Sequence, residues 1–68
     1  MTNTILLKTE IDDSGISVTL IARKLGISRE GLYLKINGET EFKASEIAKI
    51  TRVLHLSPKK RDSIFFAP

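Results

Sequence analysis

The sequence predicts an all-α domain, a compact bundle of four to five short helices. Apolar residues recur at helical spacing, with Leu7 and Ile11 one turn apart near the start and Ile47, Ile50 and Leu54 on a later stripe. No segment reads convincingly as a strand. Serines, glycines and a Ser-Pro pair stand between the apolar stripes, where helices are expected to begin and end. Because the connections are short, residues 1–68 are predicted to form one domain.

The first predicted helix covers about residues 4 to 14, with Leu7 and Ile11 facing inward and Gly15 ending it. Ile16 links it to the next helix. Ser17 is the expected N-cap there, because its hydroxyl can accept a hydrogen bond from a backbone N–H of the first turn. The second helix carries an apolar stripe at offsets 0, +3, +4 and +7, formed by Val18, Ile21, Ala22 and Leu25.

Residues 17 to 38, SVTLIARKLGISREGLYLKING, have the layout of a helix-turn-helix. Gly26 allows the sharp turn, because a residue without Cβ adopts a positive φ cheaply. Ser28 is expected to cap a second short helix, and Asn37-Gly38 to close it in a left-handed conformation. Its inward residues are Leu32 and Ile36, which leaves Arg29, Glu30, Tyr33 and Leu34 on the outer side. In a small basic protein, such a helix is a candidate for the DNA major groove.

Two further helices complete the predicted bundle. A polar loop, Glu39-Thr40-Glu41, leads to Phe42, which we expect to be a buried anchor before a helix over about residues 44 to 54. Ser57-Pro58 predicts another helix start, since proline is favoured at the first helical position, and this last helix covers about residues 58 to 65. The chain then has a strongly apolar run, which either closes the core of the monomer or forms a two-fold dimer contact: Ile64, Phe65 and Phe66.

Composition narrows the class of protein. The chain has 68 residues, no cysteine, and a formal net charge of +3, so it depends on aliphatic packing or on association rather than on disulfides. The basic balance suits a polyanionic partner. No apolar run is long enough to span a bilayer, and the N-terminus lacks the features of a secretory signal. We therefore expect a soluble, cytoplasmic protein without a membrane partner.

The motif residues resemble a known family. The run from Ser17 to Gly38, with Ala22, Leu25-Gly26-Ile27-Ser28 and Leu32 at their spacings, is similar to the helix-turn-helix of Cro and repressor proteins of bacteriophages. NGETEFKASEI followed by LSPKKRDSIFF resembles small repressor-like proteins of phages and prophages of Gram-positive bacteria. The resemblance implies a lambda-repressor-like domain that regulates transcription by binding double-stranded operator DNA with the helix 29–36. It also implies a homodimer, formed in solution or only on DNA.

The resemblance assigns two sets of DNA-contacting positions. The family's base-reading positions fall on Ser28, Arg29, Glu30, Tyr33 and Leu34. Its phosphate-contacting positions fall on Ser17, Val18 and Thr19 before and in the second helix, and on Asn37, Thr40 and Lys43 after the third. Lysines and arginines beside the motif, namely Arg23, Lys24, Lys35 and Lys43, are further candidates for neutralising phosphates.

The chain departs from the family pattern in three places. Leu34 stands where a polar or basic residue is usual, and Glu39 and Glu41 lie in a loop that is often basic. Ile11 and Ile36 replace the buried Arg–Glu pair of several lambdoid repressors, a change that is often neutral for stability. The first two departures leave an alternative open, in which the same fold is a protein-interaction module, such as an antirepressor that binds a phage repressor.

Nothing in the sequence indicates an enzyme. His55 is the single histidine, and the chain has no nucleophile motif, no phosphate-binding glycine loop and no set of metal ligands at a recognisable spacing. The basic run Lys59-Lys60-Arg61 is interpreted as a solvated face or a secondary phosphate contact. We therefore expect no catalytic site, no metal and no cofactor.

Overall fold

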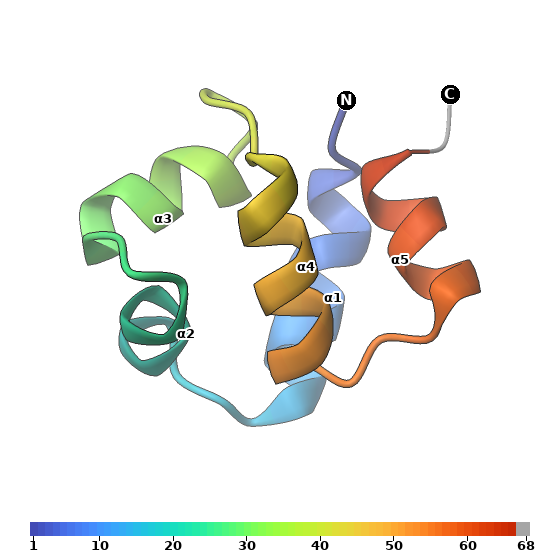
Figure 1. Ribbon diagram of the computed structural model, residues 1–68, viewed down its shortest axis with the longest axis horizontal. Helices are drawn as coiled ribbons and strands as arrows, with labels where there is room; N and C mark the ends of the chain where they lie inside the picture. The colour runs from blue at the N-terminus through green and yellow to red at the C-terminus, as the bar shows by residue number, and fades with distance from the viewer. Residues whose placement is uncertain (67–68) are drawn as a thin grey trace.

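The computed structural model describes residues 1–66, and over this range the chain is entirely helical (Figure 1). Its five helices are α1 (Thr4–Ser14), α2 (Val18–Leu25), α3 (Arg29–Ile36), α4 (Ala44–Val53) and α5 (Pro58–Phe65). The prediction of a small all-α bundle is confirmed, and the observed helix bounds lie within a residue of the predicted ones. None of these helices is both long and apolar enough to cross a membrane.

The helices begin where capping side chains satisfy the first turn. The hydroxyls of Ser17, Ser28 and Ser57 each accept a hydrogen bond from the N–H three residues further on, at 3.0–3.1 Å. Asn3 caps α1 in the same way, with its side-chain oxygen 3.0 Å from the Leu6 nitrogen. Pro58 occupies the first turn of α5, where its missing N–H costs no hydrogen bond.

Left-handed residues end most of the helices. Gly15, Gly26 and Gly38 have φ values of 70°, 75° and 79°. Gly15 and Gly26 directly follow the last residues of α1 and α2, and Gly38 is the second residue after α3. After α4 the left-handed residue is His55, with φ of 54°, which the sequence did not indicate. Asn37 keeps a negative φ, so Gly38 alone makes the left-handed turn after α3.

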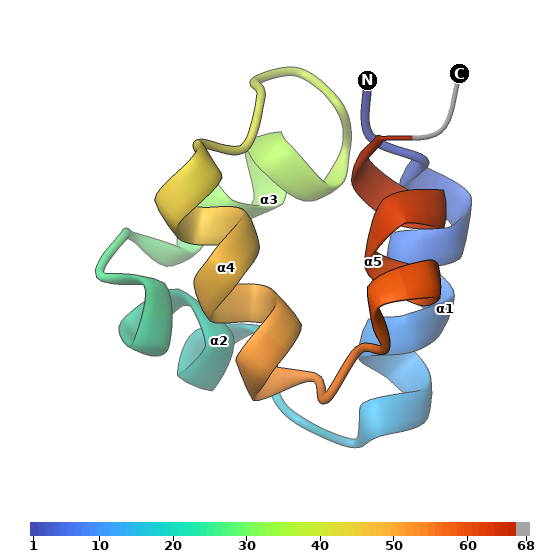
Figure 2. The same ribbon diagram turned by 45° about the vertical axis from the view of Figure 1, so that its right-hand side comes forward.

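The helices pack in two groups, α2 with α3 and α4, and α1 with α3 and α5. Figure 2 shows α5 lying alongside α1, with the start of α1 and the end of α5 on the same side of the molecule. The backbone links these ends directly, because the Asn3 N–H donates to the Ile64 carbonyl at 2.6 Å. Helix α1 therefore joins the helix-turn-helix to the C-terminal helix.

A single core lies between the five helices. Its completely buried side chains come from every one of them: Leu7, Ile21, Leu32, Ile50 and Ile64. Phe42 is buried as predicted, and its ring meets that of Phe65 edge-on with the centroids 5.2 Å apart. Because an aromatic pair of this geometry adds to the energy of burial, the loop before α4 and the end of α5 are held together.

Of the two alternatives predicted for the C-terminal apolar run, the structure shows closure of the monomer core for two of its three residues. Ile64 is completely buried and Phe65 is 5% exposed within one chain, so these two side chains close the core of the monomer. Phe66 is 60% exposed and is the one member of the run that lies open. A dimer that used Ile64 or Phe65 would have to open the core, because the helical packing already covers them.

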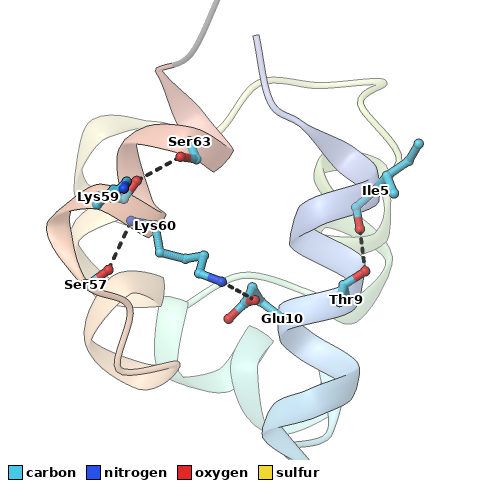
Figure 3. Close-up of polar contacts among 7 residues, drawn as sticks. All are labelled: Ile5, Thr9, Glu10, Ser57, Lys59, Lys60 and Ser63. Atoms are coloured by element: carbon cyan, nitrogen blue, oxygen red, sulfur yellow. Dashed lines mark hydrogen bonds and ion pairs between the residues drawn. The ribbon is translucent and has the colours of Figure 1, made fainter.

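The basic run at the start of α5 has local partners. Lys60 Nζ lies 3.1 Å from Glu10 Oε2, which bridges α5 and α1 (Figure 3). Arg61 Nε lies 2.9 Å from the carboxylate of Asp62, its neighbour in the chain. Of this run, Lys59 is left without an ion pair. Two of the three basic residues of this run are therefore neutralised by carboxylates of the same chain.

Candidate nucleic-acid interface

The turn between α2 and α3 is stabilised by backbone hydrogen bonds between residues close in the sequence. The Gly26 N–H donates to the Arg23 carbonyl and the Ile27 N–H to the Ala22 carbonyl, both at 3.1 Å. Ile27 is partly buried against the core, which fixes the direction in which the chain leaves the turn. Ser28 then caps α3. Two short helices joined by a tight turn are therefore present in residues 17 to 38, as predicted.

Helix α3 has a buried side and an open side, as predicted. Leu32 and Ile36 are 0% and 4% exposed and hold the helix to the core. On the outer side lie the predicted base-reading residues, Ser28, Arg29, Glu30, Tyr33 and Leu34, all of them exposed. Arg29 Cζ lies 5.6 Å from the centre of the Tyr33 ring, so the guanidinium rests over the aromatic face. Leu34 is 43% exposed, which leaves an apolar side chain open beside this pair.

The predicted phosphate contacts before α3 gather at the start of α2. Ser17 and Thr19 are exposed, while Val18 is partly buried and packs against the core. The Val18 side chain is therefore occupied, and the part of this residue that can meet an anion is its backbone N–H. The N–H groups of a first helical turn lack carbonyl partners within the helix and point along its axis, where negative charge is favoured.

One depression joins the start of α2 to the end of α3. It has a volume of about 240 Å³, and Val18, Tyr33 and Asn37 all line it, so candidate base and phosphate contacts converge there. Ile11 and Ile36 form the apolar part of its wall and are nearly buried, at 6% and 4% exposed. Ile11 and Ile36, the residues that the resemblance aligns with the buried ion pair of lambdoid repressors, are therefore apolar residues packed into the wall of this depression.

The loop after α3 is held by the end of that helix. The N–H groups of Glu39 and Thr40 donate to the Leu34 carbonyl at 2.9 and 3.3 Å, so the loop turns back over α3. The side chains of Glu39, Thr40, Glu41 and Lys43 are all exposed. This arrangement places two carboxylates and one ammonium group on the same loop as the predicted phosphate contacts Thr40 and Lys43.

Lys35 does not belong to the phosphate-neutralising set in which the sequence placed it. Its Nζ lies 3.1 Å from Glu46 Oε1 and donates to the Glu41 carbonyl at 2.9 Å, and its side chain is 12% exposed. The ammonium group also lies 6.0 Å from the centre of the Phe42 ring. Lys35 thus binds the loop and α4 to the end of α3, and its charge is already compensated inside the protein.

Glu46 is the residue of this region that the sequence analysis missed. It is the one charged residue among the buried polar residues of the described chain, at 5% exposed, and it lies in the first turn of α4. Its carboxylate accepts the Lys43 N–H at 2.7 Å in addition to pairing with Lys35. A glutamate three residues after the residue that precedes a helix is a recognisable capping position, so the spacing of Lys43 and Glu46 was the available signal.

The pKa of Glu46 reflects these contacts. Burial alone would raise the pKa of this carboxyl, because desolvation disfavours its charged form. The hydrogen bond from the Lys43 backbone, the bond from Lys35 and the positive charges of both lysines outweigh burial and lower the pKa below its usual value. Glu46 is therefore ionised at neutral pH and holds Lys35 in place.

Over residues 1–66, no three histidine, cysteine, aspartate or glutamate side chains gather closely enough to hold a metal ion. His55 is exposed at the end of α4. The chain matches no protein-family model, no curated protein and no solved structure in the comparisons made. The resemblance to Cro and repressor proteins therefore rests on the sequence motif alone.

Proposed function

We propose that this protein is a sequence-specific regulator of transcription that inserts α3 into the major groove of double-stranded operator DNA. One observation carries the proposal. Leu32 and Ile36 fix α3 to the core, while its open side presents Arg29, Glu30, Tyr33 and Leu34. Tyr33 shares a depression with Val18 at the start of α2. In the helix-turn-helix docking mode, the second helix reads bases while the first crosses the phosphate backbone.

The open side of α3 offers a chemically varied set of base contacts. The guanidinium of Arg29 can donate two hydrogen bonds to guanine O6 and N7, and the carboxylate of Glu30 can accept from cytosine N4. Leu34 can meet a thymine methyl group, since apolar contact is how proteins recognise it. Contacts of the α2 N-terminus, Asn37, Thr40 and Lys43 with phosphates would set the register of the complex.

The test is a titration of the protein with duplex fragments from its own locus, followed by fluorescence anisotropy at two salt concentrations. We expect one fragment to bind tightly and the others weakly. The substitution Arg29→Ala should cost about 1–3 kcal/mol of binding to the preferred fragment, because a bidentate contact with guanine is lost. Lys59→Ala is the matched control, since Lys59 is an exposed cation on α5, away from α3.

Phosphate contacts should respond differently from base contacts. Lys43→Ala should weaken binding to all fragments alike and make the slope of log K against log salt shallower by about 0.9, the value of one phosphate contact. Lys35→Gln should leave that slope unchanged, because Lys35 is paired with Glu46. Unchanged discrimination in Arg29→Ala would show that α3 is not the reading helix.

A second candidate function uses the same surface for protein. Tyr33 and Leu34 are 40% and 43% exposed on adjacent positions, and the nearby loop carries the exposed carboxylates of Glu39 and Glu41. An apolar spot with an acidic margin suits a protein partner better than phosphates. In this case the protein is an antirepressor, and it would bind no duplex even at low salt but would co-elute with a repressor encoded at the same locus.

A further inference from the structure

We propose that the groove between α2 and α4 is a docking surface for an acidic amphipathic helix of a partner protein. The groove has a volume of about 440 Å³. Ile16 and Leu20 line it from the α2 side and Val53 from the α4 side, and three cations border these apolar residues: Lys24, Lys49 and Arg52. Leu20 is 38% exposed and lies off the stripe that packs α2 into the core.

The surface continues across α4 toward α5. A second depression, of about 520 Å³, shares Arg52 with the first and is lined further by Ala48, Leu56 and Arg61. The two depressions are lined by the same stretch of α4 and lie on either side of Arg52. Each combines apolar residues with guanidinium or ammonium groups, so a helical segment seated in the first groove would have Arg52 and the apolar residues within reach at the same time.

The charges of this surface are unbalanced. Of the residues that line the two depressions, none is acidic. Helix α2 has no carboxylate, and the one carboxylate of α4, Glu46, is buried and paired with Lys35. Lys24, Lys49 and Arg52 form no ion pair within residues 1–66. A partner that supplies carboxylates would meet three uncompensated cations, which is the electrostatic complementarity that sets partner choice.

The unpaired acidic side chains of the chain itself lie elsewhere. They occur at the end of α1, on α3 and in the loop after α3: Asp12, Asp13, Glu30, Glu39 and Glu41. In Figure 1, α4 runs from that loop toward the turn before α5, so Lys49 and Arg52 lie along the half of the helix that leads away from it. Lys49 and Arg52 therefore lie apart from the surface proposed for DNA, and Lys24 is the one cation of the groove that is also a candidate phosphate contact.

The apolar residues favour a protein partner over nucleic acid. Phosphates would satisfy Lys49 and Arg52 but would leave Leu20 and Val53 uncovered, whereas the apolar face of an amphipathic helix would bury them. Helix-in-groove recognition combines both features, with apolar anchors one turn apart and charged residues at the margins. The molecule is 27 Å long, so a helix of about 18 residues would cross all of it.

The test uses a synthetic peptide of about this length, acetylated and amidated, with leucines on one helical stripe and glutamates on both flanks. We expect it to shift the amide resonances of α2 and α4 in the ¹⁵N-labelled protein. The double substitution Lys49→Glu and Arg52→Glu should weaken binding about tenfold or more, because like charges then face each other. Lys8→Glu with Lys59→Glu is the matched control, with the same change in net charge outside both depressions.

Three results would overturn the proposal. The first is a peptide that leaves the α2 and α4 resonances unchanged. The second is equal binding of a peptide with glutamine in place of every glutamate, which would remove the electrostatic argument. The third is a random duplex that shifts the same resonances and loses this effect in the Lys49→Glu, Arg52→Glu protein, which would make the groove a phosphate contact. Circular dichroism of each variant confirms that it is folded, and none of these outcomes depends on operator recognition by α3.

Discussion

Glu46 shows how much one side chain can organise in a domain this small. Its carboxylate is 2.7 Å from the Lys43 nitrogen and 3.1 Å from Lys35 Nζ, and Lys35 also donates to the Glu41 carbonyl. Three consecutive parts of the chain, namely the end of α3, the loop and the start of α4, therefore meet at a single ion pair. Because the pair is buried, removing either partner leaves the other charge uncompensated.

The stability of the protein should depend on the ionisation of Glu46. Since its pKa is lowered in the folded state, its contribution to stability is complete above the usual glutamate pKa of 4.5 and is lost as the pH falls through the folded-state pKa. Glu46→Gln should cost about 1.5–3 kcal/mol at neutral pH, the value of a hydrogen bond to a charged group. Urea denaturation of both proteins at neutral pH and at about pH 3 measures the difference, which should shrink in acid. A difference independent of pH would mean that the charge of Glu46 does not matter.

His55 carries the other feature that matters at the residue scale. It has φ of 54°, a conformation in which a side chain with Cβ is strained, although its N–H still donates to the Arg52 carbonyl at 3.3 Å. His55→Gly should raise the free energy of unfolding by about 0.5–1 kcal/mol, since relief of the left-handed strain exceeds the entropy cost of glycine. His55→Ala keeps the strain and should bring no gain. If the two variants are equally stable in thermal unfolding, the strain is absent.

At the scale of the elements, short helices depend on their ends and on packing. Helices α2, α3 and α5 have eight residues each, well below the length at which an isolated helix is stable in water. Each begins at a serine whose hydroxyl accepts a first-turn N–H. The sequence predicted these three starts correctly, because capping is a local interaction between neighbours in the chain.

Two of the serine caps allow the effect on stability to be separated from the effect on DNA recognition. Ser57→Ala should lower the free energy of unfolding by about 1 kcal/mol and leave DNA binding unchanged, because α5 lies apart from α3. Ser28→Ala should cost a similar amount of stability and in addition weaken operator binding, because it loosens the start of the proposed reading helix. Chemical denaturation and anisotropy give the two quantities. Equal operator affinity in both variants would argue against recognition by the first turn of α3.

At the scale of the whole molecule, α5 completes the core. Phe65 meets Phe42 across the bundle, Ile64 is completely buried, and the Lys60–Glu10 ion pair ties α5 to α1. A domain of this length buries only about 60% of the surface that its unfolded chain exposes, so the core contacts of Ile64 and Phe65 form a large share of what holds the bundle together.

Phe65→Ala should lower the free energy of unfolding by about 3–5 kcal/mol, because it removes a buried aromatic side chain and leaves a cavity beside Phe42. Phe66→Ala provides the control, since Phe66 is 60% exposed and its truncation should change stability by less than about 0.5 kcal/mol. Urea denaturation distinguishes them. Similar stabilities of the two variants would place Phe65 outside the core, and concentration-dependent unfolding that Phe66→Ala abolishes would show that the exposed ring joins two copies.

The sequence by itself determined the all-helical class, the bounds of the helices to within a residue, and most of the core. Periodic apolar residues, serine caps and glycine ends are local signals, so Leu32 and Ile36 on the inner side of α3 and Arg29 on its outer side could all be assigned without coordinates. Only the tertiary structure decided which charged side chains are paired and which apolar side chains near the C-terminus are buried. It paired Lys35 with Glu46, placed Ile64 and Phe65 inside the monomer, and gathered Lys24, Lys49 and Arg52 along one groove. These features depend on contacts between helices distant in the chain, and such contacts leave no periodic trace in the sequence.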